Sequence, residues 1–109
     1  MRSMFAFSAN ISTLFTDHPL PERFAAARAA GFDAVELQFP YAHTADELAA
    51  CLNASGQRLV LHNLPAGDWS SGERGIACHP GREEEFRAGV EQAMAYATEL
   101  GVTQLNCLA

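Results

Sequence analysis

The stretch Ala30-Gly31-Phe32-Asp33-Ala34-Val35-Glu36 has a counterpart near the end of the chain, Leu100-Gly101-Val102-Thr103-Gln104-Leu105-Asn106. Each stretch has a glycine suited to ending a helix, then an apolar residue, and a polar residue five positions after the glycine. An internal repeat of a helix end followed by a strand is typical of a barrel built from successive βα units. It fits a doubly wound sheet, in which the strand order reverses, less well.

Working outward from these stretches, four strands are expected to alternate with three helices. The expected strands are residues 4–9, 34–39, 58–62 and 102–107, and the expected helices are residues 22–30, 44–55 and 82–100. The order βαβαβαβ predicts an α/β fold with a parallel sheet. Residues 8–12, at the end of the first strand and directly after it, contain no glycine. The glycine-rich fingerprint of a dinucleotide-binding fold is therefore missing.

Local signals support the second and third helices. Thr44 and Glu47 have the spacing of a capping box, and Leu48, Cys51 and Leu52 form one apolar stripe. The residues expected on the buried face of the third helix are Phe86, Val90, Ala93, Ala97 and Leu100. We interpret the glutamate run at 83–85 as a solvated helix start at the positive end of the helix dipole, in preference to a metal site.

The length of 109 residues is short for a barrel, since a complete (β/α)8 barrel takes about 250 residues. We therefore expect one incomplete domain over residues 1–109, holding the first three and a half βα units of a TIM barrel. Seven scattered arginines against thirteen acidic residues give a formal net charge of −6, which disfavours a nucleic-acid partner. No apolar run approaches the length of a membrane span, and three widely spaced cysteines favour a reducing, cytoplasmic location.

Candidate site residues follow from the rule that barrel enzymes build their sites at the carboxyl ends of the strands. The residues selected in this way are Asn10, Glu36, Gln38, His62, Asn63 and Asn106. Glu36 alternates with Val35 and Leu37, so its side chain should enter the barrel interior and need a partner there, either an arginine or a bound polar ligand. Asn10 and Asn106 have the alternative of satisfying backbone groups, and His62 the alternative of a hydrogen-bonded core histidine.

The connection at 63–80 is long for a βα loop and lies on the same face. It contains Trp69 and Arg74, which a merely solvated loop does not need, so we expect an ordered lid or pocket wall. The alternative for Trp69 is packing of the loop against the body of the protein. Cys78-His79 has no second Cys or His at ligand spacing, which disfavours a zinc site.

A resemblance to a known family is strongest across residues 61–69 (LHNLPAGDW), 72–78 (GERGIAC) and 80–86 (PGREEEF). Residues 7–12, 31–36 with 39–41, and 106–108 match as well. On these residues the sequence resembles the hydroxypyruvate isomerase family, in the xylose-isomerase-like group of TIM barrels. The related 2-oxo-tetronate isomerase branch looks less similar over residues 62–78 and ranks second.

The resemblance implies an aldose–ketose isomerisation of a small 2-oxo or hydroxy acid, hydroxypyruvate to tartronate semialdehyde, through an enediol. It also implies a divalent metal, Mg²⁺ or Mn²⁺, with the metal ligands and the catalytic glutamates in the second half of the barrel. No catalytic or metal-binding residue is therefore assigned within this chain. The residues expected to face the substrate are above all His62, Asn63, Trp69 and Arg74, the last as a partner for a carboxylate.

A different class of function is a half-barrel interaction module that assembles with itself or with a separate second half. Strand four would then be an unpaired edge, and the interior side chains would lack an opposite wall. For the same reason we expect the isolated chain to self-associate through its open sheet edges.

Overall fold

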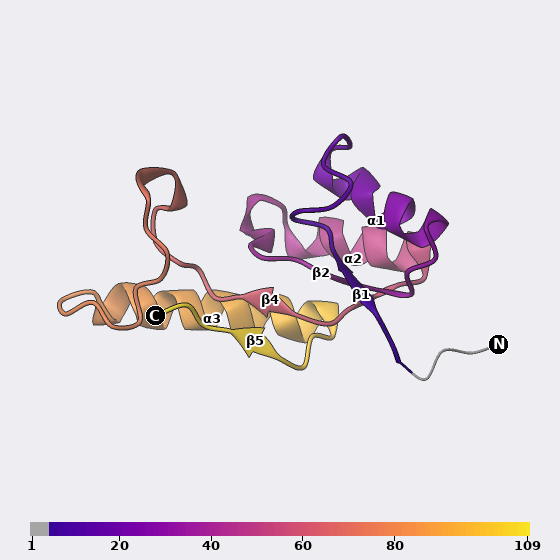
Figure 1. Cartoon of the computed structure of the whole chain (residues 1–109). Coiled ribbons are helices and arrows are strands. Elements are labelled where there is room, and N and C mark those ends of the chain that lie inside the picture. The colour runs from indigo at the N-terminus through magenta and orange to yellow at the C-terminus, as the bar shows by residue number, and fades with distance from the viewer. Residues whose placement is uncertain (1–4) are drawn as a thin grey trace.

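The computed structural model describes residues 5–109. The strands are β1 (Ser8–Asn10), β2 (Ala34–Glu36), β3 (Arg58–Leu59), β4 (His62–Asn63) and β5 (Leu105–Asn106). The helices are α1 (Leu20–Ala29), α2 (Ala45–Ser55) and α3 (Glu83–Leu100), with short 3-10 turns η1 (Pro40–Ala42) and η2 (Trp69–Ser71). Strands and helices alternate along the chain as predicted, and α1 packs against α2 and α2 against α3 (Figure 1).

All strand pairs are parallel, which confirms the predicted fold class. β1, β2 and β3 form one sheet in that order, and β4 pairs with β5. β3 and β4 are successive parts of one extended segment that follows β2, since Leu37 N–H donates to Leu61 O at 3.1 Å and Asn63 N–H to Gln38 O at 2.9 Å. Within residues 5–109 the sheet does not close, so β1 and β5 lie at its two outer edges.

Three of the four predicted strands were too long, and the third, expected over residues 58–62, consists of β3 and β4 and ends at Asn63. The first was expected over residues 4–9, of which Met4 lies outside the described residues, yet pairing covers only Ser8–Asn10. Phe5 and Phe7 are 71% and 65% exposed and precede the residues that pair with β2, which shows that apolar character alone does not define a strand. Strand two ends at Glu36 ahead of the turn that begins at Pro40, and the expected fourth strand pairs only over β5.

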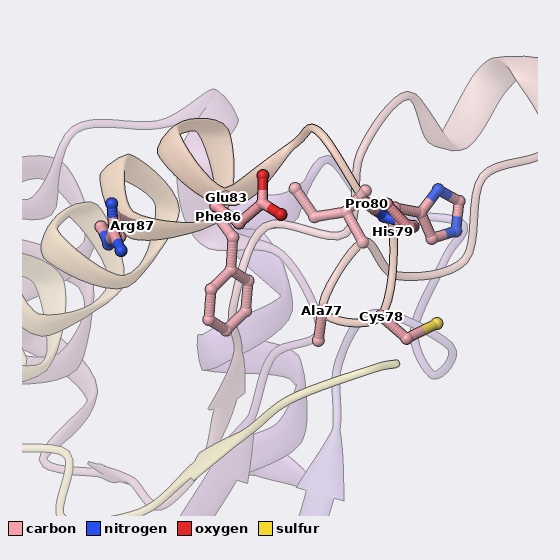
Figure 2. A pocket seen from close by; sticks show the side chains of 8 residues that line it. Ala77, Cys78, His79, Pro80, Glu83, Phe86 and Arg87 are labelled. Carbon is pink, nitrogen blue, oxygen red and sulfur yellow. The ribbon is translucent and has the colours of Figure 1, made fainter.

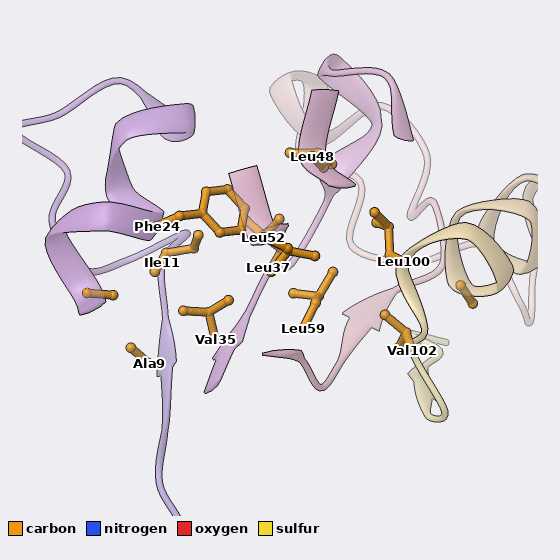
Figure 3. Close-up of a cluster of buried hydrophobic side chains, with 12 residues drawn as sticks. Ala9, Ile11, Phe24, Val35, Leu37, Leu48, Leu52, Leu59, Leu100 and Val102 are labelled. Atoms are coloured by element: carbon orange, nitrogen blue, oxygen red, sulfur yellow. The ribbon is translucent and has the colours of Figure 1, made fainter. Parts of the chain in front are cut away.

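The hydrophobic core lies between the sheet and the helices (Figure 3). Phe24 of α1 and Leu48 of α2 are at most 1% exposed and lie in the same cluster as Val35 and Leu59 of the sheet. The predicted capping box of α2 is present: the Thr44 hydroxyl accepts from Glu47 N–H, and the Glu47 carboxylate accepts from Thr44 N–H. It starts α2 at the point from which the apolar stripe faces the sheet.

The buried face of α3 is shorter than predicted. Ala93, Ala97 and Leu100 are buried, whereas Phe86 and Val90 are only partly buried. The reason is that the first half of α3 packs on the loop that follows β4 in place of the sheet. Gly89 of α3 lies against Pro65 of this loop, since a Cβ added at Gly89 would be 3.4 Å from the proline ring. The three glutamates at 83–85 are exposed in the first turn of the helix, as expected for a solvated helix start.

Candidate functional site

A cavity of about 300 Å³ lies at the carboxyl ends of the strands. The register that builds it pairs Asn10 with Glu36, and Asn63 with Asn106. Its polar lining consists of Asn10, Glu36, Gln38, Asn63 and Asn106. Its apolar lining consists of Leu37, Leu61, Trp69 and Leu108. The parallel sheet thus brings polar residues from four strand ends to one place, which is where barrel enzymes bind their ligands.

Hydrogen bonds fix most of these polar side chains. Asn106 Nδ2 donates to Asn63 Oδ1 at 3.2 Å, which joins the ends of β4 and β5. Asn10 Oδ1 accepts from Ser12 N–H at 3.0 Å, and Ser12 Oγ in turn accepts from Gln38 N–H at 2.9 Å. Asn10 therefore also has the local backbone role that the sequence left open as an alternative.

The carboxylate of Glu36 enters the cavity, as the alternation with Val35 and Leu37 indicated, but its partner was not foreseen. Within the described residues that partner is a serine hydroxyl in place of the expected arginine. Ser8 Oγ donates to Glu36 Oε2 at 2.7 Å, from the neighbouring strand β1. Glu36 is half-buried, so one hydroxyl together with access to water is sufficient for a carboxylate at this position.

Trp69 stands at one side of the cavity between two other side chains. Its ring lies 4.9 Å from the ring of Phe39, and the Arg74 guanidinium stacks over it at 3.7 Å from the ring centroid. Arg74 Nη1 also donates to the carbonyls of Trp69 and Glu73, at 2.9 and 2.8 Å. Arg74 therefore supports Trp69 from behind and is not among the residues that line the cavity, where the sequence analysis had placed it.

The loop that carries Trp69 is ordered by charged contacts. Arg82 holds the Glu73 carboxylate with two nitrogens, and these hydrogen bonds lower the pKa of Glu73 to about 2. Asp68 accepts from the hydroxyls of Ser70 and Ser71, both at 2.7 Å, and these bonds lower its pKa as well. Side-chain hydrogen bonds thus hold the loop at Asp68 and at Glu73.

His62 points away from the cavity. Its side chain is completely buried, and Nε2 lies 3.2 Å from the carbonyl oxygen of Ala93 on α3. Nδ1 has no hydrogen-bond partner among the described residues. Burial lowers the pKa of His62, because a charged ring would lose its hydration there. The placement agrees with the core histidine that the sequence left open, since in a strand His62 and Asn63 must face opposite sides.

Tyr41 does not line the cavity but supports the lining residue Asn63, and the sequence analysis did not select it. Its hydroxyl donates to the backbone carbonyl of Asn63, and its ring meets the edges of His62 and Tyr96 at centroid distances of 6.2 and 5.1 Å. The pKa of Tyr41 is raised, mainly by burial and secondly by the neighbouring Tyr96. The sequence signals were its place directly after Pro40, near the carboxyl end of strand two, and its inclusion in the stretch 39–41 that carries the family resemblance.

The described residues do not fit a divalent metal. Within residues 5–109 no group of three or more His, Cys, Asp and Glu side chains comes together, and the cavity lining holds a single carboxylate, Glu36. A divalent hard cation needs more oxygen ligands than this wall offers in one place. The amides and the carboxylate of this wall are able to bind and orient a small polar ligand.

A second hollow of about 440 Å³ lies outside this site, between the loop and the first turns of α3 (Figure 2). Ile76, Cys78, His79 and Phe86 are among its lining residues. Arg87, at its margin, is paired with Glu84, and Glu83 accepts from Gly81 N–H at 3.2 Å. Glu83 and Arg87 of this hollow thus have partners within the protein. Over the described residues, no helix has the length and apolar character needed to cross a membrane.

Comparison with known proteins gives a consistent assignment. Residues 24–109 match the xylose isomerase-like TIM barrel family. Hydroxypyruvate isomerase of Escherichia coli is 52% identical over 105 residues, which are 96% of this chain and 41% of that protein. The 2-oxo-tetronate isomerase of Cupriavidus necator is 47% identical over 103 residues, 94% of this chain and 40% of that protein.

A solved structure agrees with the fold. The crystal structure of an AP endonuclease, family 2, from Brucella melitensis superposes on this chain with a TM-score of 0.91 at 47% sequence identity. The superposed region comprises 94% of this chain and 40% of the Brucella chain. The chain thus spans about 40% of the length of the relatives it matches.

Proposed function

The chain belongs to the xylose isomerase-like TIM barrel family, and from this premise we propose that it forms the N-terminal part of an aldose–ketose isomerase acting on hydroxypyruvate. The observation that carries the proposal is the 52% identity to the E. coli hydroxypyruvate isomerase across 96% of the chain. The polar cavity at the strand ends supports it, since the reaction needs a site that binds several oxygens of a small substrate.

The reaction moves a proton between neighbouring carbons. A base removes a proton from C3 of hydroxypyruvate, an enediol forms, and a proton returns to C2 to give tartronate semialdehyde. The described cavity has amides and one carboxylate, and we propose that this wall binds and orients the substrate. The groups that transfer the proton, and a divalent metal with its ligands, would then belong to parts of the enzyme outside this chain.

Three residues of the wall, and Tyr41 behind it, have specific parts in this proposal. The amide groups of Asn63 and Asn106, held to each other, present donors and acceptors to substrate oxygens. Trp69, fixed between Phe39 and Arg74, covers the cavity and limits the access of water to a reactive enediol. Tyr41 acts indirectly, because its bond to the Asn63 carbonyl holds the end of β4 in place.

The proposal is tested with a fusion of this chain to the part of the E. coli relative that lies beyond the aligned region. Isomerisation of hydroxypyruvate is followed by NMR with Mg²⁺ or Mn²⁺ present, for the fusion and for the 109-residue chain alone. We expect turnover by the fusion and none by the chain alone. Turnover by the chain alone near that of the complete relative would refute the division of labour, and a folded but inactive fusion would refute the substrate assignment.

A second candidate is a 2-oxo-tetronate isomerase, which the 47% identity to the C. necator enzyme supports. The same fusion distinguishes the two when both substrates are offered, since the substrate with the larger kcat/KM is the preferred one.

The name of the Brucella relative suggests nucleic-acid cleavage, but two observations disfavour it here. The chain has a formal net charge of −6, and no cationic side chain is among the described residues that line the cavity.

A further inference from the structure

We propose that Glu36, oriented by Ser8, selects a hydroxyl group of the substrate and directs the substrate carboxylate away from this wall of the cavity. This inference rests on the proposed function and adds the orientation of the substrate to it. It assigns Glu36 a specificity role and Ser8 a positioning role.

The charge of the wall is the first argument. Glu36 is the only charged residue among the described residues that line the cavity. Arg74, the cation that contacts Trp69 of this wall, is held by two carbonyls and by the face of Trp69. A substrate carboxylate placed here would meet a like charge with no compensating cation, and such an arrangement is unfavourable in a partly desolvated site.

The hydrogen-bonding capacity of the wall is the second argument. Ser8 Oγ donates to Glu36 Oε2 at 2.7 Å and so fixes the plane of the carboxylate. No other described side chain donates to Glu36, which leaves Oε1 with the capacity to accept a proton donor from the cavity. A hydroxyl donates to such an oxygen, whereas an ionised carboxylate has no proton to donate.

The neighbouring amides complete the match. Asn63 Oδ1 is taken by Asn106 Nδ2, so Asn63 Nδ2 keeps its donor capacity in the same cavity as the acceptor Glu36 Oε1. An acceptor together with a donor complements a hydroxyl group beside a carbonyl, which is the end of hydroxypyruvate opposite its carboxylate. The wall therefore binds the hydroxyketone end, and the carboxylate points toward the open side of the half-barrel.

Three ligands separate these two ends of the substrate. Hydroxypyruvate has a hydroxyl, a carbonyl and a carboxylate; pyruvate lacks the hydroxyl, and dihydroxyacetone lacks the carboxylate. Their affinities for the full 109-residue chain are measured by ligand-observed NMR, which tolerates self-association. The variants are Glu36→Gln, which keeps the size but removes the charge, and the control Glu91→Gln, which makes the same change at an exposed position of α3.

We expect the wild type to bind hydroxypyruvate more tightly than pyruvate, and Glu36→Gln to reduce that ratio by about tenfold, as the loss of a hydrogen bond to a charged group predicts. Dihydroxyacetone should lose affinity in parallel, and pyruvate should not. Glu91→Gln should leave all ratios unchanged. Ser8→Ala should reduce the ratio partway in the wild-type background and have no effect on it in the Glu36→Gln background, as its positioning role requires.

An equal loss of affinity for all three ligands in Glu36→Gln would overturn the proposal, because Glu36 would then only maintain the shape of the wall. The absence of any preference for the hydroxyl-bearing ligands in the wild type would overturn it too. The proposed function fails separately. A preference for dihydroxyacetone that depends on Glu36, combined with a fusion that does not isomerise hydroxypyruvate, would remove the function and keep the role of Glu36.

Discussion

Replacing His62 with leucine tests how the buried histidine under α3 contributes to folding. The imidazole is completely buried, one nitrogen lies 3.2 Å from the Ala93 carbonyl, and Nδ1 is unpartnered within residues 5–109. Leucine has a similar size and lacks both polar atoms. The variant therefore loses one hydrogen bond and also loses the penalty of one buried, unsatisfied acceptor.

The two effects have opposite signs and similar size, about 1 kcal/mol for the bond and about 1–3 kcal/mol for the unsatisfied group. We expect the free energy of unfolding of His62→Leu at pH 8 to lie within about 1–2 kcal/mol of the wild type. The pH dependence should differ more clearly. Burial lowers the pKa of His62 in the folded state, so as pH falls below the ordinary value of about 6.5 the unfolded state takes up the proton first.

The contribution of His62 to stability is therefore fully present above about pH 6.5 and declines as the pH falls from there toward the lowered folded pKa. One extra proton bound by the unfolded state gives a slope of up to about 1.4 kcal/mol per pH unit. The assay is urea unfolding from pH 8 to pH 5 at one fixed protein concentration, with the exposed His79→Leu as control. The reasoning is refuted if His62→Leu keeps the wild-type slope, or if His79→Leu removes it.

Three further predictions concern the loop and the sheet edges. Gly75→Ala places a Cβ against the Leu108 carbonyl oxygen at a φ of +121°, so it should lower the free energy of unfolding by more than the control Gly81→Ala does. Gly81 also has a positive φ but open space around it, and urea unfolding compares the two variants. Arg82→Met should raise the pKa of Glu73 from about 2 toward 4.5, and carboxyl ¹³C NMR measures this change. Because the pKa of Glu73 is lowered in the folded wild type, its contribution to stability is present above about pH 4.5 and is lost as the pH falls toward 2. The isolated chain should self-associate through the edges of β1 and β5, and a concentration-independent monomer in sedimentation would contradict this.

The alternation of elements and the helix boundaries could be predicted from the sequence because they depend on near neighbours. The capping box of Thr44 and Glu47 spans one turn, and the glycine at position 56 ends α2 in a left-handed conformation at φ +67°. The choice of Asn10, Glu36, Asn63 and Asn106 as site residues followed from their place at strand ends, a rule that needs the order of strands but not their exact pairing.

Only the tertiary structure decided what each of these side chains contacts. Ser8 reaches Glu36 across 28 positions of sequence, and Tyr41 reaches Asn63 across 22, so both contacts depend on the register of parallel strands. The placement of His62 depends on the same register, because side chains alternate along a strand and a shift by one residue exchanges the cavity side for the helix side. Arg74 stacks on Trp69 and donates to two backbone carbonyls, contacts that depend on how the loop folds and that the sequence pattern could not show. Local patterns fix the bonds within one turn or one strand, whereas contacts between distant segments are fixed only when packing brings those segments together.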